Sequence, residues 1–167
     1  MMISRSEMQV HKLAIFLLLV FFAVPVCAQQ TGKVVPEATD LKVLGDLARK
    51  QQLPIMLMVS QQDCPYCVLL KSDILNPMMI SGDYVDRVII AELTIDQGGS
   101  ITDFDGKTVS PRDVAVRYNS TFSPTLLFLD ANGRQVRKRM VGVNTIEMYG
   151  YYVDESIDAA VKAIRSR

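Results

Sequence analysis

Two cysteines three positions apart, Cys64 and Cys67, constrain this sequence more than any other feature. They enclose Pro65 and Tyr66 and follow a short apolar run at residues 55–59. A disulfide between them would close a very short loop, and short loops stabilise a fold little because they restrict the unfolded chain little. The spacing therefore favours reversible redox chemistry over a structural disulfide. An inert structural disulfide and one half of a metal site are the alternatives.

The first 28 residues have the order of a secretory signal peptide. Arg5 and Lys12 precede an unbroken apolar run at residues 13–24, and small residues lead to Ala28. This run is shorter than the about 20 residues that a membrane-spanning helix needs. We therefore expect cleavage near Ala28 and a periplasmic or secreted mature protein. The alternatives are lipidation at Cys27 and retention as an uncleaved anchor.

Removal of this segment would change the inventory of possible ligands. The single histidine, His11, lies within it, which would leave Cys64 and Cys67 as the only thiols and no imidazole. Because a tetrahedral zinc site uses about four Cys or His ligands, we expect no metal.

The net charge gives no reason to expect a nucleic-acid partner, because lysine plus arginine and aspartate plus glutamate are balanced at 18 each.

The rest of the chain alternates between helical and strand patterns. Residues 29–37 form a polar lead-in, and residues 38–167 form the expected domain. We expect helices at residues 39–52, from 65 to Asn76-Pro77, at 110–118 and at 145–164, with an interruption of the last one at Gly150 considered. We expect strands at residues 55–59, 88–95, 125–129 and 135–141, with a small hairpin or a surface excursion within 100–109. Alternation followed by a hairpin predicts an α/β fold with a mixed β-sheet.

The CPYC motif between a strand and a helix resembles the thioredoxin family, and the resemblance covers essentially the whole mature chain. Residues 91–96 (AELTID) look like the central strand of that family, residues 123–130 (SPTLLFLD) like its cis-proline segment, and Asn132-Gly133 like its hairpin turn. The CPYC motif, the ILN-P segment and the TDFDGK excursion resemble periplasmic thioredoxins of the SoxW type. The resemblance implies a thioredoxin fold, with a mixed β-sheet flanked by helices on both faces.

The chemistry of thiols assigns roles to the two cysteines. A helix N-terminus favours the thiolate, so Cys64 is expected to be the nucleophile, and Cys67 is expected to resolve the mixed disulfide. By resemblance, Pro124 should be cis and face the disulfide, where its missing N–H leaves the backbone edge open to an extended client. The residues expected to contact clients are Pro65, Tyr66 and Ser123.

Three positions depart from ordinary thioredoxins. Asp63 replaces the Trp that precedes the first Cys, and Met58 stands where the family buries an Asp. Glu92 stands where the family places a Lys on the central strand beside that Asp. A lone carboxylate in an apolar strand is costly unless it is paired or protonated. We expect that Glu92 either points outward or pairs with a lysine or arginine, or that it lies beneath the motif and accepts the proton of Cys67.

Together these features predict a protein-disulfide reductase that needs no cofactor beyond the Cys64–Cys67 disulfide. We expect proteins with thiols or disulfides as clients, a membrane electron donor as the source of electrons, and a monomer. One alternative is a disulfide-forming oxidase, although oxidising members of the family usually carry a helical insertion that this chain lacks. The other alternative is a non-enzymatic module that binds copper or an iron–sulfur cluster.

Overall fold

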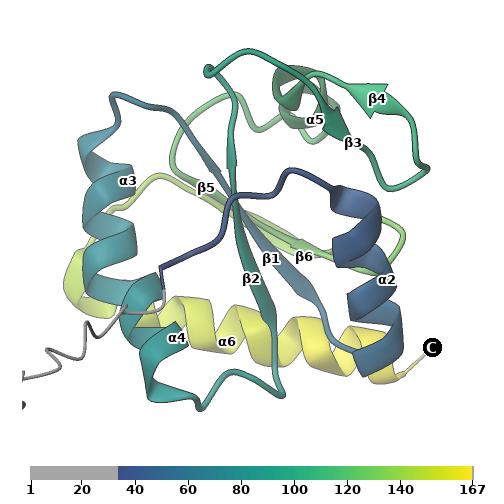
Figure 1. Ribbon diagram of the computed structural model, residues 1–167. Coiled ribbons are helices and arrows are strands. Elements are labelled where there is room, and N and C mark those ends of the chain that lie inside the picture. The colour runs from purple at the N-terminus through teal and green to yellow at the C-terminus, as the bar shows by residue number, and fades with distance from the viewer. Residues whose placement is uncertain (1–33, 167) are drawn as a thin grey trace, which may run out of the picture. The chain divides into compact units, whose positions relative to one another are not determined.

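The computed structural model describes residues 34–166, so the expected signal peptide, Cys27 and the first part of the lead-in lie outside the described residues. Within them, β1 (Ile55–Ser60) pairs in parallel with β2 (Ile89–Thr94) and antiparallel with β5 (Thr125–Leu129). β5 pairs antiparallel with β6 (Gln135–Val141), which gives the strand order β2-β1-β5-β6. The mixed sheet that the sequence predicts is confirmed (Figure 1).

Helices cover both faces of this sheet (Figure 1). One face carries α2 (Leu41–Gln51) and α5 (Pro111–Arg117). The other face carries α6 (Ile146–Arg165) and one continuous helical stretch, which consists of α3 (Pro65–Leu70), the π-helix η2 (Lys71–Leu75) and α4 (Asn76–Ser81). A separate two-stranded ribbon joins β3 (Ile101–Thr102) to β4 (Thr108–Val109), which confirms the expected hairpin.

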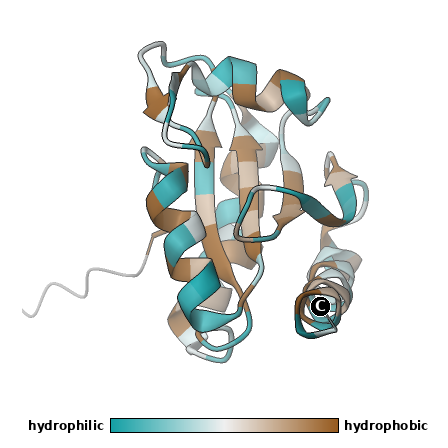
Figure 2. Ribbon diagram, turned by 90° about the vertical axis from the view of Figure 1, so that its right-hand side faces the viewer, coloured by the Kyte–Doolittle hydropathy of each residue, from teal (hydrophilic) through white to brown (hydrophobic). Residues whose placement is uncertain are grey.

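Alternation along the strands divides the apolar residues between two cores. Met56 and Met58 of β1 point to the α3–α6 side and pack in one cluster with both cysteines. Leu57 and Val59 point to the α2–α5 side and pack in the second cluster. Apolar side chains therefore line both faces of the sheet. In Figure 2 much of the ribbon of the central strands is brown, the colour of hydrophobic residues.

Local sequence signals explain where the helices begin. The Asp40 carboxylate accepts a hydrogen bond of 2.8 Å from the N–H of Val43 at the start of α2. Ser110 Oγ accepts one of 3.1 Å from the N–H of Asp113 at the start of α5, and Pro111 occupies the first helical position. Both arrangements satisfy donors that have no partner within a helix.

The structure corrects the expected end of the helix that follows the cysteines. That helix does not stop at Asn76-Pro77 but continues to Ser81. The N–H of Asn76 donates to the carbonyl of Lys71, five residues earlier, so the helix widens into a π-turn just before the proline. This local change of pitch accommodates Pro77, which has no N–H to donate.

The interruption considered at Gly150 is absent, because α6 runs continuously through that residue. A Cβ placed on Gly150 would lie 3.5 Å from Cδ1 of Ile74, at ordinary contact distance.

Among residues 34–166, no helix has both the length and the apolar character needed to cross a bilayer.

The described end of the lead-in lies along the free edge of β2. Glu92 N–H donates to the carbonyl of Pro36 at 2.8 Å, and the N–H of Ala38 donates to the carbonyl of Glu92 at 2.6 Å. Val35 is buried in the cluster that contains the cysteines, and its N–H donates to Oδ1 of Asn76 at 3.3 Å. This segment therefore ties the edge of the sheet to the helical stretch that carries the cysteines.

Candidate redox site

Cys64 and Cys67 form a disulfide at the N-terminus of α3. Cys64 is the N-cap residue, and its Sγ accepts a hydrogen bond of 3.1 Å from the N–H of Cys67. Pro65 occupies the first helical position, so it removes a donor that would have no partner there. The order strand, turn, cysteine and helix therefore follows directly from the local sequence.

The two cysteine residues differ in their access to solvent. Cys64 is 8% exposed and Cys67 is 2% exposed, so a partner can reach the first more easily than the second. The N–H of Cys67, in the first turn of the helix, points at Cys64 Sγ. Such donors favour a thiolate over a thiol. The geometry fits a nucleophilic Cys64 and a shielded Cys67.

Two side-chain contacts hold the loop that precedes Cys64. The carboxylate of Asp96 accepts from the N–H of Gln62 at 3.0 and 3.3 Å. Ser123 Oγ donates to Oε1 of Gln61 at 2.7 Å. The second contact brings the Ser123–Pro124 segment to the loop that precedes the disulfide, although Ser123 and Gln61 are 62 positions apart in the sequence.

The peptide bond between Ser123 and Pro124 is cis, and Pro124 is buried. Its carbonyl accepts a hydrogen bond of 2.8 Å from the N–H of Gly142, just beyond the end of β6. Large apolar side chains near this segment and near the disulfide lie open to solvent, namely Tyr66, Val68 and Phe122, each at least 60% exposed. Pro65 is exposed as well. These positions are accessible to a bound partner.

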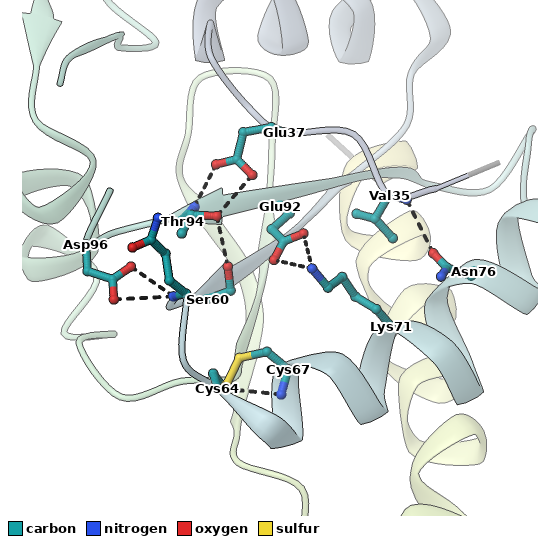
Figure 3. Close-up of polar contacts among 11 residues, drawn as sticks. Val35, Glu37, Ser60, Cys64, Cys67, Lys71, Asn76, Glu92, Thr94 and Asp96 are labelled. Atoms are coloured by element: carbon teal, nitrogen blue, oxygen red, sulfur yellow. Dashed lines mark hydrogen bonds and ion pairs between the residues drawn. A yellow bond between two sulfur atoms is a disulfide. The ribbon is translucent and has the colours of Figure 1, made fainter. Parts of the chain in front are cut away.

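Glu92 is buried and ion-paired. Its carboxylate accepts two hydrogen bonds from Lys71 Nζ, at 2.9 Å to Oε1 and 2.8 Å to Oε2. Figure 3 shows Lys71 on the helical stretch that follows Cys67, with its side chain directed at Glu92 on β2. One of the two expectations from the sequence was such a pair with a lysine. The role of Glu92 as acceptor of the Cys67 proton stays a prediction.

A second set of polar side chains crosses the same face of β1 and β2. Ser60 Oγ and Thr94 Oγ1 lie 3.2 Å apart and are buried. The carboxylate of Glu37 accepts from Thr94 N–H at 2.8 Å and from Thr94 Oγ1 at 3.0 Å (Figure 3). Every buried polar group in this set therefore has a partner, as burial requires.

Sequence reasoning missed the lysine that pairs with Glu92, although a signal was present. Lys71 follows the apolar run Val68–Leu70 and lies four residues after Cys67, so it shares one helix face with it. Gln61 gave no comparable signal, because its contact with Ser123 depends on the tertiary fold.

Within the described part of the chain, no group of three or more His, Cys, Asp or Glu side chains could hold a metal ion.

The sequence matches one known protein family over the region that contains the redox site. Residues 44–156 match the thioredoxin-like domain family, a stretch that includes the disulfide, Glu92 and the cis-proline. The chain belongs to the thioredoxin-like family. No curated protein sequence matches it.

Solved structures with the same fold have low sequence identity to this chain. The structure titled DsbH oxidoreductase has 18% identity and a TM-score of 0.55, covering 80% of this chain and 90% of its own. Thioredoxin from Fasciola hepatica has 18% identity and a TM-score of 0.50, covering 74% and 97%. Mitochondrial thioredoxin 3 from Saccharomyces cerevisiae, in its oxidised form, has 15% identity and a TM-score of 0.50, covering 74% and 93%. At these identities the likeness establishes the fold alone. A thioredoxin-like fold with a Cys-X-X-Cys disulfide supports thiol–disulfide oxidoreductase chemistry in general.

Proposed function

We propose that this protein is a protein-disulfide reductase that acts in the periplasm or outside the cell, like the thioredoxins of the SoxW type that its motif resembles. One observation carries the proposal: the disulfide lies at a helix N-terminus, where Cys64 Sγ accepts a hydrogen bond of 3.1 Å from the N–H of Cys67. That arrangement lowers the cost of a thiolate on Cys64, and the thiolate is the species that attacks disulfides.

The first step consumes the reduced form of the protein. The Cys64 thiolate attacks one sulfur of a client disulfide, a bond forms between Cys64 Sγ and that sulfur, and the other client sulfur leaves as a thiolate. Pro65, Tyr66 and Ser123 contact the client, and the backbone beside Pro124 pairs with its extended chain. The exposed rings of Tyr66 and Phe122 provide apolar contact area.

The second step releases the client. Cys67 loses its proton and attacks Cys64 Sγ, which breaks the mixed disulfide and frees the second client thiol. The client disulfide gains two electrons, and Cys64 and Cys67 lose two as they form their own disulfide. We assign Glu92 as the acceptor of the Cys67 proton, directly or through one water. A membrane electron donor then returns the protein to the dithiol form.

Trapping of the mixed disulfide tests this division of labour. Cys67→Ala should accumulate mixed disulfides with client proteins, because the step that releases the client is blocked. Cys64→Ala should accumulate none, and the variant that lacks both cysteines is the control for non-covalent association. Iodoacetamide should modify Cys64 first below about pH 7. Preferential labelling of Cys67 would reverse the assignment, and the absence of any mixed disulfide with Cys67→Ala would favour a non-enzymatic binding module.

A further inference from the structure

A cavity of about 350 Å³ lies between β6 and the N-terminal half of α6. Its walls come from residues 137–141 of β6, from Gly142 just beyond the strand and from one side of α6, including Tyr149, Tyr152 and Glu155. We refer to it as the β6–α6 cavity. Its volume is at the lower end of the range of ligand sites, about 300–1,000 Å³, so it can hold one or two side chains of a partner.

Positive charge dominates the walls of the β6–α6 cavity. Arg137, Lys138 and Arg139 line it, and among the described lining residues Glu155 is the one acidic side chain. The Glu155 carboxylate is 3.8 Å from Nη2 of Arg137, at the outer limit of an ion pair. Lys138 and Arg139 form no ion pair with any residue from 34 to 166. The cavity therefore favours a negatively charged occupant.

Two buried donors in the walls have no hydrogen-bond partner. Tyr149 is 5% exposed, and its Oη bonds to no described atom. Nε of Arg139 is likewise buried without a partner. Burial raises the pKa of Tyr149 to about 12, so its hydroxyl keeps its proton at neutral pH and is available as a donor. Buried donors without acceptors are uncommon because they are costly, and oxygen atoms of a ligand would satisfy both.

The cavity adjoins the segment that faces clients. Val141 and Gly142 line it, and the N–H of Gly142 donates to the carbonyl of Pro124 at 2.8 Å. A Cβ placed on Gly142 would lie 3.7 Å from Cε1 of Phe122, the exposed ring that precedes Ser123-Pro124. A client chain that passes Pro124 and Phe122 can therefore continue into the cavity.

We propose that the β6–α6 cavity binds an acidic side chain in the client, located a few residues from the disulfide that is reduced. The client carboxylate accepts hydrogen bonds from Tyr149 Oη and from Arg139, while Arg137 and Lys138 attract it over a longer range. The preferred clients are thus proteins with Asp or Glu near the target disulfide. This inference rests on the proposed reductase function, and the test below separates the two.

The test uses two disulfide-containing peptides that differ only in a Glu-Glu or Gln-Gln pair, placed at two to six residues from the disulfide. The purified protein should reduce the acidic peptide with a kcat/KM about tenfold higher, mainly through a lower KM, as expected for charged hydrogen bonds. The preference should fall with added salt, because salt screens charges. In Arg139→Gln most of the preference should be lost while the Gln-Gln peptide is reduced as before.

Two further variants make the result specific. Tyr149→Phe should stay folded, because it removes a polar atom that has no partner, yet it should lose part of the preference for the acidic peptide. Arg112→Gln, which changes an exposed arginine on α5 outside the cavity, should keep the full preference. Equal reduction of both peptides by the unmodified protein, or a preference that Arg139→Gln leaves undiminished, would overturn the proposal.

Binding without turnover separates this inference from the proposed function. The variant with both cysteines replaced by serine should bind the fluorescently labelled Glu-Glu peptide more tightly than the Gln-Gln peptide. If neither peptide is reduced but this difference in binding persists, the reductase proposal fails and the acidic site stands. If inorganic phosphate binds at the cavity while the two peptides bind equally, the cavity is a site for small anions and the proposal of an acidic client is wrong.

Discussion

Lys71 Nζ lies within 2.9 Å of both carboxylate oxygens of Glu92, and the pair is largely buried on the face of the sheet that packs against the cysteine helix. Met58, which stands where the family buries an acid, is the direct neighbour of Glu92 in the parallel pairing of β1 with β2. Glu92 therefore places a carboxylate one strand outward from Met58, and its counter-ion, Lys71, comes from the helical stretch that follows Cys67. This relationship leads to two predictions.

Glu92→Gln should slow the release of the client from the mixed disulfide. The amide has nearly the shape of the carboxylate but cannot take the Cys67 proton, so the resolving step should slow by on the order of tenfold or more near pH 7. Attack by Cys64 should change little, since that sulfur is served by backbone donors. Stopped-flow measurement of both steps across pH distinguishes them. An unchanged rate and pH profile for resolution would mean that water takes the proton.

Lys71→Met should lower the free energy of unfolding by about 2 kcal/mol, because it leaves the Glu92 carboxylate buried without its partner. Lys71→Arg should restore most of this loss, since arginine can also donate two hydrogen bonds. Lys71→Met in the Glu92→Gln background should cost much less than in the unmodified protein, a coupling that a double-mutant cycle measures by urea unfolding. Additive losses would mean that the two side chains do not stabilise each other.

Most of the fold follows from local patterns in the sequence. The apolar run before Cys64 reads as a buried strand, and the hairpin signal at Asn132-Gly133 places the strands on either side at their observed ends, 129 and 135. The helix after Cys67 was predicted too short, because the rule that proline ends a helix does not anticipate a π-turn before Pro77. Local patterns identify elements well and unusual hydrogen bonding poorly.

The candidate site is predicted only in part. The positions of Cys64 and Cys67 on a helix N-terminus follow from the motif, because Pro65 and the preceding strand set the local geometry. The contact of Ser123 with Gln61 and the pairing of Lys71 with Glu92 join residues that are 62 and 21 positions apart. Such contacts depend on how the strands are ordered and on where the helix crosses the sheet, which no short window of sequence contains.

Ser123→Ala should weaken the alignment of the client-facing segment with the disulfide. The substitution removes the 2.7 Å hydrogen bond to Gln61, a loss of about 1 kcal/mol in stability at most. We expect a KM for client disulfides a few-fold higher, with little change in the reaction of Cys64 with iodoacetamide. Ser72→Ala is the control, because it removes an exposed serine hydroxyl from the helical stretch that follows Cys67. It should leave KM unchanged. The same KM for both variants would exclude a role for Ser123 in client binding.

Stability should depend on pH through Asp103 and Arg117. The Arg117 guanidinium donates to both carboxylate oxygens of Asp103, at 2.6 and 2.8 Å, and this pairing holds the pKa of Asp103 below its usual value of 3.8. Because the folded state binds this proton less readily than the unfolded state, the stabilisation is present above that value and is lost as the pH falls through the lower pKa of the folded state.

Arg117→Gln should therefore lower the free energy of unfolding by about 1 kcal/mol at pH 7, a modest figure because Arg117 is half-exposed and solvent screens the pair. The difference from the unmodified protein should shrink progressively below about pH 4, as Asp103 becomes protonated. Urea unfolding over this pH range measures both effects, with Arg112→Gln as the matched control. A loss that is the same at all pH values would show that the ion pair is not its cause.

The reduction potential of the Cys64–Cys67 pair tests the proposed direction of electron flow most directly. The purified protein is equilibrated with glutathione buffers of graded ratio, and the fractions of dithiol and disulfide are measured after acid quenching. A reductase should give a potential near that of thioredoxin, about −270 mV, where the dithiol readily gives up its electrons to client disulfides. A potential near about −120 mV, typical of a strong oxidant whose reduced form is stabilised, would contradict the reductase and identify a disulfide-forming oxidase instead.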